Sequence, residues 1–412
     1  MKSVLAKIKP SKSEEKKLLE ISNEIISKIN ISGTKVQLGG SAAKNTWLKG
    51  DYDLDFYVKF SKKFNNKNIS NILEKELIKK FNNVSRVHGS RDYFQFIYKN
   101  YFVEIIPIIH IKKADNAENI TDVSPLHVKW VLKHRKKVDE IRLAKAFCKA
   151  NKIYGAESYI MGFSGYVLEI LTIYYGNFKN LISNVAKWKD KTIIDIENYY
   201  FGDKDILKNL NASKIQSPLI LIDPVQKTRN AAAGINHEKY SLFILKAKEF
   251  LSNPSDDFFK PKKFSLDKLK KESSKDNLIV LNVKPLEGKK DIIGSKLLKC
   301  HNLILKQLKL HKFIVKSDGW VWEKKDQALF WYILDSNSLS KMVKHYGPPK
   351  NYKVRFDKFK KKWDDKKIHE DNNKTYVILE REYCKPEKLI KDLITKDFIL
   401  SRVKKIDFHN FS

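Results

Sequence analysis

The chain has 412 residues, of which 42% are apolar, so it has enough material for roughly two to four folded domains and is too apolar for a disordered protein. Lys and Arg total 81 against 48 Asp and Glu, which gives a formal net charge of +33 spread along most of the chain. Charge of this sign favours a polyanionic partner, of which nucleic acid is the commonest. The alternative is a Lys/Asn/Ile-rich composition imposed by genome base bias.

The three cysteines, Cys148, Cys300 and Cys384, lie far apart in the chain. They exclude a disulfide framework and a cysteine-rich metal cluster, and they fit a reducing compartment. The opening residues lack the apolar stretch of a signal peptide, and no apolar run approaches the ~20 residues that cross a bilayer. We therefore expect a cytoplasmic protein with no membrane partner.

Apolar residues at helical spacing predict a helix over residues 13–29. A strand-like stretch follows over 51–60, and two further strands are expected over 94–98 and 101–109, joined like a hairpin at Lys99-Asn100. A helix followed by strands that carry carboxylates predicts a small α/β or α+β unit that ends near residue 120.

The middle of the chain is predicted to be helical, beginning at Ser124-Pro125, where a cap residue precedes a proline. Ser252-Asn253-Pro254-Ser255 breaks the helical pattern and is the best candidate for a linker. Beyond it, strands and helices alternate without a repeat. We expect three domains, over 1–123, 124–255 and 256–412, with an α+β fold overall. The helices expected in the middle domain cover 140–151, 164–175, 181–188 and 237–252, and the strands and helices expected in the last domain cover 278–283, 295–310, 320–322, 328–334, 376–382 and 386–394.

Two aspartates in the strand-like stretch point to metal chemistry. Asp53 and Asp55 are separated by one residue, so on a strand they project from the same face, with Leu54 behind them in the core. Nucleotidyl transfer needs two divalent ions about 3.5–4 Å apart, and Mg²⁺ prefers carboxylate oxygens. A D-x-D pair alone is more often a solvated strand edge, and Asp51 lies on the same alternation.

The residues just before this pair raise its significance. Gly39-Gly40-Ser41 lets the backbone approach a triphosphate, and the Ser41 hydroxyl and nearby amides can bind its oxygens. Lys44 adds positive charge. Glu104, between Val103 and Ile105, is a candidate for a third metal carboxylate, because an acid there is costly if it is simply buried. The alternative for Glu104 is an exposed edge position.

From these residues onward the chain resembles archaeal-type (class I) CCA-adding enzymes, the tRNA nucleotidyltransferases. The resemblance starts at the segment 40–50 and the Asp53-Leu54-Asp55 that follows, and further blocks occur in the family's order up to residue 262. The rest resembles the family in element order and basic character. The further blocks are Ser124–Trp130, Arg142–Phe147, Ile153–Glu157, Gly162–Tyr166, Asp223-Pro224-Val225 with Arg229-Asn230, and Phe258–Lys262.

The resemblance implies a polymerase-β-like nucleotidyltransferase head, a helical central domain that takes part in nucleotide binding, and a mixed α/β RNA-binding C-terminal region. It also implies a site with three groups of residues. Asp53, Asp55 and Glu104 would be the carboxylates that hold two Mg²⁺ ions. The nucleotide would be bound by Ser41, Lys44, His127, Lys145, Tyr154 and Arg229, of which Arg229 would help recognise the base.

Two positions depart from the family pattern. Lys44 stands where the family usually has arginine, so bidentate phosphate contact is lost while the charge remains. Glu104 stands where it usually has aspartate, and the longer side chain requires a small shift of metal or backbone.

Without the resemblance, each nucleotide-binding residue of the middle domain has a plainer interpretation. His127 near a helix start is more often a capping or core histidine. Lys145 could extend along a helix surface to reach solvent. Tyr154, before a glycine, could be a packing contact at a helix end. Arg229 could form a surface salt bridge.

The resemblance therefore implies template-independent addition of C, C and A to the 3′ end of tRNA from CTP and ATP. The partner would be the acceptor arm and 3′ end of tRNA, and a homodimer is left open. The alternatives are another RNA terminal nucleotidyltransferase, adding poly(A) or uridylate, and a non-catalytic RNA-binding relative. The basic runs at 260–263, 358–362 and 366–367 could contact phosphate, and Trp320 and Trp322 could stack on RNA, although core packing is the simpler role for them.

Overall fold

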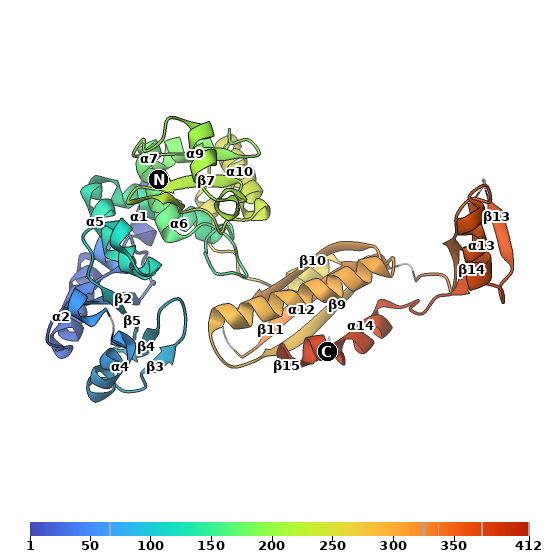
Figure 1. The fold of residues 1–412 in the computed structure, drawn as a ribbon, viewed down its shortest axis with the longest axis horizontal. Helices are drawn as coiled ribbons and strands as arrows, with labels where there is room; N and C mark the ends of the chain where they lie inside the picture. Colours follow the sequence, from blue (N-terminus) through green and yellow to red (C-terminus); the bar gives the residue numbers. More distant parts are fainter. Residues whose placement is uncertain (66, 324–325, 337, 372–373, 411–412) are drawn as a thin grey trace. The chain divides into compact units, whose positions relative to one another are not determined.

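The computed structural model describes residues 1–65, 67–323, 326–336, 338–371 and 374–410. The chain forms two compact units, Met1–Lys262 and Lys263–Ser412 (Figure 1). The predicted linker at residues 252–255 precedes the division between them, because Phe258 and Phe259 still pack on Phe147 in the core of the first unit. The predicted separation of 1–123 from 124–255 within the first unit stays a prediction.

The N-terminal part of the first unit is a five-stranded sheet with helices on one face. Strands β2 and β5 lie parallel at its centre, and the remaining pairs are antiparallel, in the order β1-β2-β5-β4-β3. The strands are β1 (Thr34–Leu38), β2 (Asp53–Phe60), β3 (Ser85–Val87), β4 (Tyr93–Tyr98) and β5 (Tyr101–Ile109), and the helices are α2 (Lys12–Lys28), α3 (Gly40–Lys44) and α4 (Ile69–Lys80).

Alternation along the central strands decides which face is buried. Leu54 and Phe56 of β2 are fully buried with apolar residues of α2 and α4, as the sequence predicts. The hairpin between β4 and β5 is also confirmed, with Lys99 and Asn100 in the left-handed region that such a tight turn requires. The opposite face of the sheet carries Asp55 and therefore the candidate active site.

The second part of the first unit packs helices around an aromatic core centred on Phe147. The predicted helices are present, and the fold also contains a small sheet in the order β6-β7-β8 that the sequence pattern did not predict. The elements are α1 (Lys2–Ile8), α5 (Ser124–Lys133), α6 (Val138–Ala150), α7 (Gly165–Tyr175), α8 (Phe178–Val185), α9 (Asp203–Asn209), α10 (His237–Ser252), β6 (Thr192–Ile194), β7 (Leu219–Asp223) and β8 (Gln226–Asn230).

Helix α5 differs from the prediction at its first turn. Val123 is its N-cap residue and Ser124 is already helical, with Pro125 in the first turn. A short 3₁₀ helix leads directly into α5, so a side-chain cap is not needed there. The 3₁₀ segments of the chain are Lys62–Phe64, Ala114–Asn116, Ile120–Val123, Arg135–Lys137, Ala212–Ile215 and Asp256–Phe259.

The second unit contains a four-stranded antiparallel sheet, in the order β10-β11-β9-β15, packed with the long helix α12. Trp320 and Trp322 pack against this core, which supports the simpler of the two roles predicted for them. A smaller sheet has the order β12-β14-β13. The elements are β9 (Asn277–Pro285), β10 (Val315–Trp322), β11 (Ala328–Leu334), β12 (Met342–Tyr346), β13 (Ile368–Asp371), β14 (Lys374–Glu380), β15 (Val403–Phe408), α11 (Leu266–Glu272), α12 (Lys290–Leu310), α13 (Lys353–Lys362), α14 (Pro386–Ile394) and α15 (Asp397–Leu400).

Candidate active site

The parallel pairing of β2 with β5 brings the predicted carboxylates together. Asp55 lies directly opposite Glu104 in the ladder, and Asp53 lies two residues earlier on the same face of β2. Burial, together with the neighbouring carboxylates of Glu104 and Asp53, raises the pKa of Asp55 to about 7. The three acids therefore share one region of negative charge, and Glu104 lies beside Asp55 on the neighbouring strand, where a third carboxylate was expected.

The glycine segment before β2 lies against these acids. Gly40 has a positive φ of 55°, and a Cβ atom on it would lie 1.7 Å from Oδ2 of Asp55. The amide of Gly39 donates to the carbonyl of Asp55 over 2.7 Å. The predicted phosphate-binding loop continues directly into the short helix α3, which places Ser41 in a helical first turn. Only glycine fits position 40 without displacing the carboxylate.

The donor set suits a hard divalent cation. Mg²⁺ prefers oxygen ligands, and three carboxylates on two adjacent strands supply them together with excess negative charge for a cation to neutralise. Gln95 donates to Oε2 of Glu104 over 2.6 Å, which orients the longer of the three side chains. Among the described residues, no three His, Cys, Asp or Glu side chains already converge as a preformed metal-ligand set.

A buried glutamate links the two predicted phosphate-binding lysines. Glu169 of α7 is fully buried; its Oε2 accepts from Lys44 over 2.7 Å, and its Oε1 accepts from Lys145 over 2.8 Å. Thr46 also donates to Oε1 over 2.8 Å. Burial would raise the pKa of Glu169, but Lys145 and Lys44 lower it to about 2. Burial lowers the pKa of Lys145 to about 8 in spite of Glu169.

Tyr154 and Lys145 meet at the start of α7. A Cβ atom on Gly165 would lie 3.0 Å from the Tyr154 hydroxyl oxygen and 3.4 Å from Nζ of Lys145. Burial raises the pKa of Tyr154, so its hydroxyl stays protonated and can donate. The predicted pair therefore lies together, and Gly165 leaves the space between them.

A second buried carboxylate gathers the other predicted residues. Asp223, at the end of β7, is fully buried and accepts from His127 Nε2 over 3.1 Å, and it forms an ion pair with Arg229 of β8. Tyr166 donates to Asp223 over 3.2 Å, and its ring stacks on His127 with centroids 4.2 Å apart. Burial lowers the pKa of His127 despite Asp223, so the imidazole is neutral at pH 7.

The two clusters are adjacent. Nζ of Lys44 lies 5.9 Å from the centroid of the Tyr166 ring, so Lys44 contacts both the Glu169 cluster and the aromatic pair of the Asp223 cluster. Asp51, the alternative acid of the D-x-D segment, lies before β2 and pairs with Lys149 over 2.6 Å. It is therefore separate from the carboxylates on the strand face.

The structure adds Glu169, Asp223 and Tyr166 to the residues that the sequence singled out. Glu169 had a usable signal, since it is the only charged residue in the apolar helix Gly165–Tyr175. Asp223 and Tyr166 lie in segments that carry the resemblance, but no pattern within those segments distinguishes them. Their roles follow from contacts that only the folded chain provides.

Three family models match successive parts of the chain. Residues 17–137 match the nucleotidyltransferase domain, residues 139–260 the second domain of tRNA nucleotidyltransferase, and residues 279–402 the C-terminal domain of CCA-adding enzyme. These matches confirm the multidomain α+β fold expected from the sequence. The first two cover the carboxylates and the clusters around Glu169 and Asp223.

Solved structures support the same fold. Cid1, described as having RNA terminal uridylyl transferase activity, aligns with a TM-score of 0.52 over 64% of this chain and 97% of its own, at 12% identity. A likeness at this identity concerns the fold alone.

No described helix is long and apolar enough to traverse a membrane.

Curated relatives are similar over almost the whole length of the chain. The CCA-adding enzyme of Nanoarchaeum equitans is 36% identical over 85% of this chain and 87% of its own. That of Methanocaldococcus jannaschii is 31% identical over 96% of this chain and 90% of its own. With these relatives and three matching domain models in order, the chain belongs to the archaeal CCA-adding enzymes, a family of tRNA nucleotidyltransferases.

Proposed function

We propose that the chain adds C, C and A in turn to the 3′ end of tRNA, using CTP and ATP at one active site. The observation that carries this proposal is the contiguous arrangement of Asp53, Asp55 and Glu104 with a buried pair of lysines, in a chain similar to CCA-adding enzymes over its length. The fold alone would also suit a uridylyl or poly(A) transferase, and the relatives favour CCA addition.

Asp53, Asp55 and Glu104 would hold two Mg²⁺ ions, with Glu104 contributing to one of them. When bound, these ions lower the pKa of the attacking 3′-hydroxyl and stabilise charge on the leaving pyrophosphate. Gly40 keeps its backbone against Asp55 and leaves that carboxylate free to face the ions. Gln95 holds Glu104 in place, so the longer side chain can serve where the family usually has aspartate.

Lys44, Lys145 and Tyr154 would bind the triphosphate together with Ser41. Glu169 bonds to both lysine ammonium groups and restrains them before a nucleotide arrives, so less side-chain entropy is lost on binding. Glu169 is therefore a positioning residue. The pair of lysines carries one more positive charge than Glu169 neutralises, and this excess attracts the triphosphate.

Arg229 and His127 would contact the base and sugar of the nucleotide. Asp223 bonds to both and fixes their orientation, and the ring of Tyr166 supports His127 from its other face. Because these groups are few, the shape of the growing RNA end would supply part of the choice between CTP and ATP.

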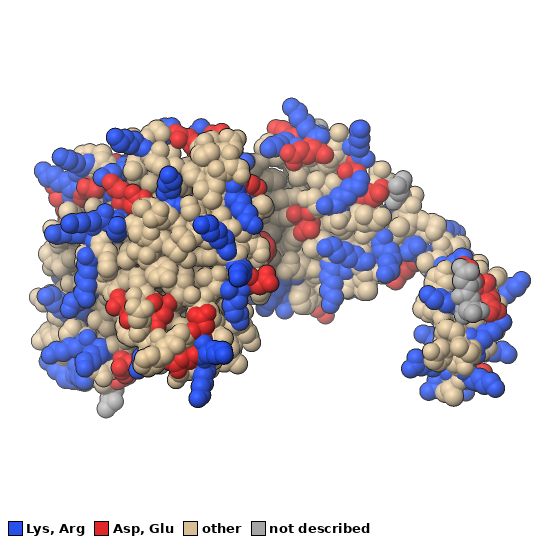
Figure 2. Space-filling view, turned by 90° about the horizontal axis from the view of Figure 1, so that it is seen from above, with Lys and Arg blue, Asp and Glu red and all other residues tan. Residues whose placement is uncertain are grey.

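The basic side chains would bind the acceptor arm. Figure 2 shows Lys and Arg spread over the visible face of each unit. The run at 358–362 lies in α13, where Lys358, Lys360, Lys361 and Lys362 are exposed. Duplex RNA is recognised mainly by shape, phosphates and 2′-hydroxyls, which suits lysines that need no fixed geometry. Affinity should fall steeply with salt if many phosphates are contacted.

The test uses tRNAs that end before CCA, at C and at CC, with labelled CTP or ATP and Mg²⁺. Three single additions in the order C, C, A support the proposal. An open-ended tail of one nucleotide would identify the chain as another terminal transferase. Absence of pyrophosphate release with all three tRNAs would favour a non-catalytic RNA-binding role.

A further inference from the structure

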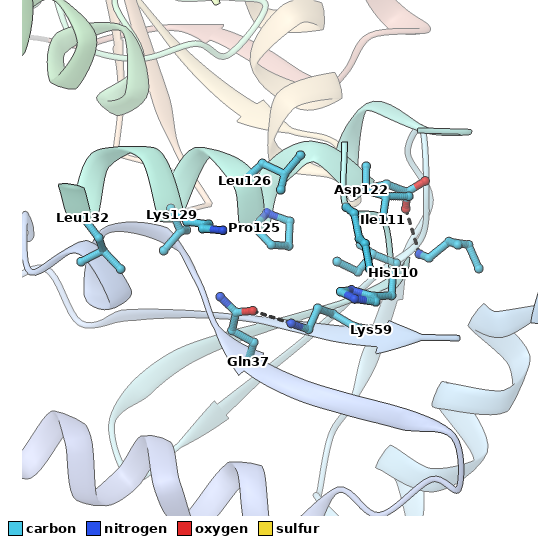
Figure 3. A pocket seen from close by; sticks show the side chains of 13 residues that line it. Gln37, Lys59, His110, Ile111, Asp122, Pro125, Leu126, Lys129 and Leu132 are labelled. Atoms are coloured by element: carbon cyan, nitrogen blue, oxygen red, sulfur yellow. Dashed lines mark hydrogen bonds between the residues drawn. The ribbon is translucent and has the colours of Figure 1, made fainter. Parts of the chain in front are cut away.

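A cavity lies on the same face of the N-terminal sheet as the carboxylates. It has a volume of about 530 Å³ and opens between the strands β1, β2 and β5 and the helix α5 (Figure 3). We call it the lysine cavity. Its polar and apolar lining includes Gln37, Lys59, His110, Lys112, Lys129 and Leu132.

The lysine cavity is separate from the active site. Lys59 lies four residues beyond Asp55 on β2, which is about 13 Å along a strand. Tyr57, Ile106 and Ile108 form a small buried apolar cluster on this face of β2 and β5. Tyr57 lies between Asp55 and Lys59 in the alternation of β2, so a ligand in the cavity would not touch the catalytic carboxylates.

Positive charges gather here without acidic partners. Lys35 of β1 is directly opposite Lys59 in the ladder, an arrangement of like charges that destabilises a sheet. Nζ of Lys59 donates over 2.7 Å to the neutral amide oxygen of Gln37. In the described part of the chain, none of Lys35, Lys59, Lys112 and Lys129 forms an ion pair within 4.0 Å. Burial lowers the pKa of Lys59, and Lys35 lowers it further.

The single acid in the wall does not neutralise this charge. Oδ1 of Asp122 accepts from the amide of Ile109 over 3.0 Å, and its Oδ2 accepts from Arg91 and from the amide of Asn119, each over 3.0 Å. Burial lowers the pKa of His110, and Lys59 and Lys112 lower it further, so both basic groups experience the same positive field. The cavity therefore has a net positive potential that a bound anion would relieve.

The remaining wall is apolar. Pro125, Leu126 and Leu132 come from α5, and Ile108 comes from β5. Figure 3 shows Lys129, Pro125 and Leu132 on the side of α5 that faces the strands, with Lys59 and Gln37 across from them. Cavities of this size take small molecules, and an apolar wall beside convergent cations suits a ring system that bears phosphates.

We propose that the lysine cavity binds a nucleoside polyphosphate at a second, non-catalytic site. The phosphates would lie between Lys59 and Lys112 and beside Lys35, which removes the repulsion between Lys35 and Lys59. The base would lie against Pro125 and Leu132. The same chemistry could come from a free nucleotide or from an unpaired nucleotide of RNA, and a competition experiment distinguishes these two sources.

The first test is the stoichiometry of ATP binding, measured by calorimetry with Mg²⁺ and without tRNA so that no turnover occurs. Two ATP molecules per chain are expected for the natural chain. The double variant Lys59→Gln, Lys112→Gln should bind one ATP, at the active site. The matched control Lys145→Gln, which weakens the active site, should also bind one ATP, in the lysine cavity. A single ATP per chain in the natural protein, lost in Lys145→Gln and kept in the double variant, overturns the proposal.

The second test uses Lys35→Glu, because this substitution places a carboxylate opposite Lys59 and removes the like-charge pair. Lys35 is exposed, so folding is preserved and the melting temperature should rise. Affinity for ATP at the second site should nevertheless fall by about tenfold or more, the loss expected for a charge-assisted contact. Unchanged affinity in this better-folded variant would refute a phosphate-binding role for the cluster.

The source of the nucleotide is decided by competition. If free nucleotide is the ligand, a single-stranded RNA without a tRNA fold leaves the second ATP site intact. If the ligand is an unpaired RNA nucleotide, that RNA displaces ATP from the second site of the natural chain. It does not displace the ATP that the double variant still binds at its active site. Pyrophosphate tests the apolar wall, since it should bind the lysine cavity at least tenfold more weakly than ATP.

Discussion

Replacing Glu169 by glutamine tests the central element of the proposed site. The carboxylate is fully buried and bonds to Lys44, Lys145 and Thr46. The lowering of its pKa from 4.5 to about 2 corresponds to about 3 kcal/mol in favour of the charged form. Breaking a buried pair by removing one partner costs a similar 3–5 kcal/mol or so. We expect Glu169→Gln to lose about 3 kcal/mol of unfolding free energy at pH 7.

The pH range of this loss follows from the sign of the pKa change. Because the folded pKa of Glu169 lies below its unfolded value, its stabilisation is fully present above pH 4.5 and is lost as the pH falls toward 2. A urea titration at pH 7 therefore measures the whole effect. The matched control is Glu24→Gln, which removes an exposed pair with Lys99 and should change the free energy of unfolding far less than Glu169→Gln does.

The same substitution should change catalysis in a way that destabilisation alone does not. Glu169 supports the charge of Lys145, whose pKa is about 8 in the natural chain. The kcat/KM for CTP should fall as the pH rises through 8, and in Glu169→Gln this fall should begin about one pH unit lower or more. The KM for CTP should rise at least tenfold, since the lysines lose their common restraint. Glu169→Asp should recover part of both effects.

The assay is the initial rate of CTP incorporation into a tRNA that lacks its CCA end, measured between pH 6.5 and pH 9 on each variant at a temperature where it is folded. If Glu169→Gln lowers stability while the pH profile and the KM for CTP stay those of the natural chain, Glu169 is only structural. The idea that it positions Lys44 and Lys145 for the triphosphate would then be abandoned.

Three further substitutions test the neighbouring contacts. Gly40→Ala combines a positive φ with a Cβ atom 1.7 Å from Asp55, so incorporation should fall at least 100-fold while tRNA binding by filter retention is unchanged. Asp55→Asn should abolish incorporation yet raise the stability of the metal-free chain by about 2–4 kcal/mol above pH 7. The reason is that the raised pKa makes ionisation of Asp55 in the folded chain increasingly costly from pH 3.8 to about 7. A lower melting temperature of the variant at pH 8 would contradict this. Asp223→Asn removes the charge that holds Arg229 and His127, so UTP and GTP should be misincorporated more often, and unchanged fidelity would show that these residues need no such support.

Local patterns in the sequence predicted the elements that carry the carboxylates. Alternation placed Asp53 and Asp55 on one face of a strand, and the hairpin at Lys99-Asn100 indicated where the next two strands meet. Alternation cannot say which strands become neighbours, so the parallel pairing that places Glu104 opposite Asp55 emerged only from the fold. The glycines before Ser41 read as a loop, because five residues are too few to show a helical period, and α3 was missed.

The second group of residues was less predictable because its contacts span long sequence separations. Glu169 is 125 residues from Lys44, and His127 is 96 residues from Asp223. The one sequence signal for Glu169 is that it is the single charged residue of an otherwise uncharged, largely apolar helix. The strands β6 to β8 are three to five residues long, and β8 is mostly polar, so a helical middle domain was the natural prediction and the sheet that carries Asp223 and Arg229 was not found.

The charges in the two buried clusters are divided unequally, and this bears on how one site accepts two bases. Glu169 faces two lysines, which leaves an excess positive charge beside the carboxylates, whereas Asp223 faces Arg229 and a neutral His127, which leaves almost none. Binding energy should therefore come chiefly from the triphosphate and little from the base. Without tRNA, we expect the Kd values for CTP and ATP to agree within about tenfold. A single hydrogen bond that is made to one base and not to the other changes Kd by little more than this. Calorimetry on Lys59→Gln, Lys112→Gln, in which the active site is the remaining ATP site, measures both constants; a preference above 100-fold would show that the protein alone reads the base.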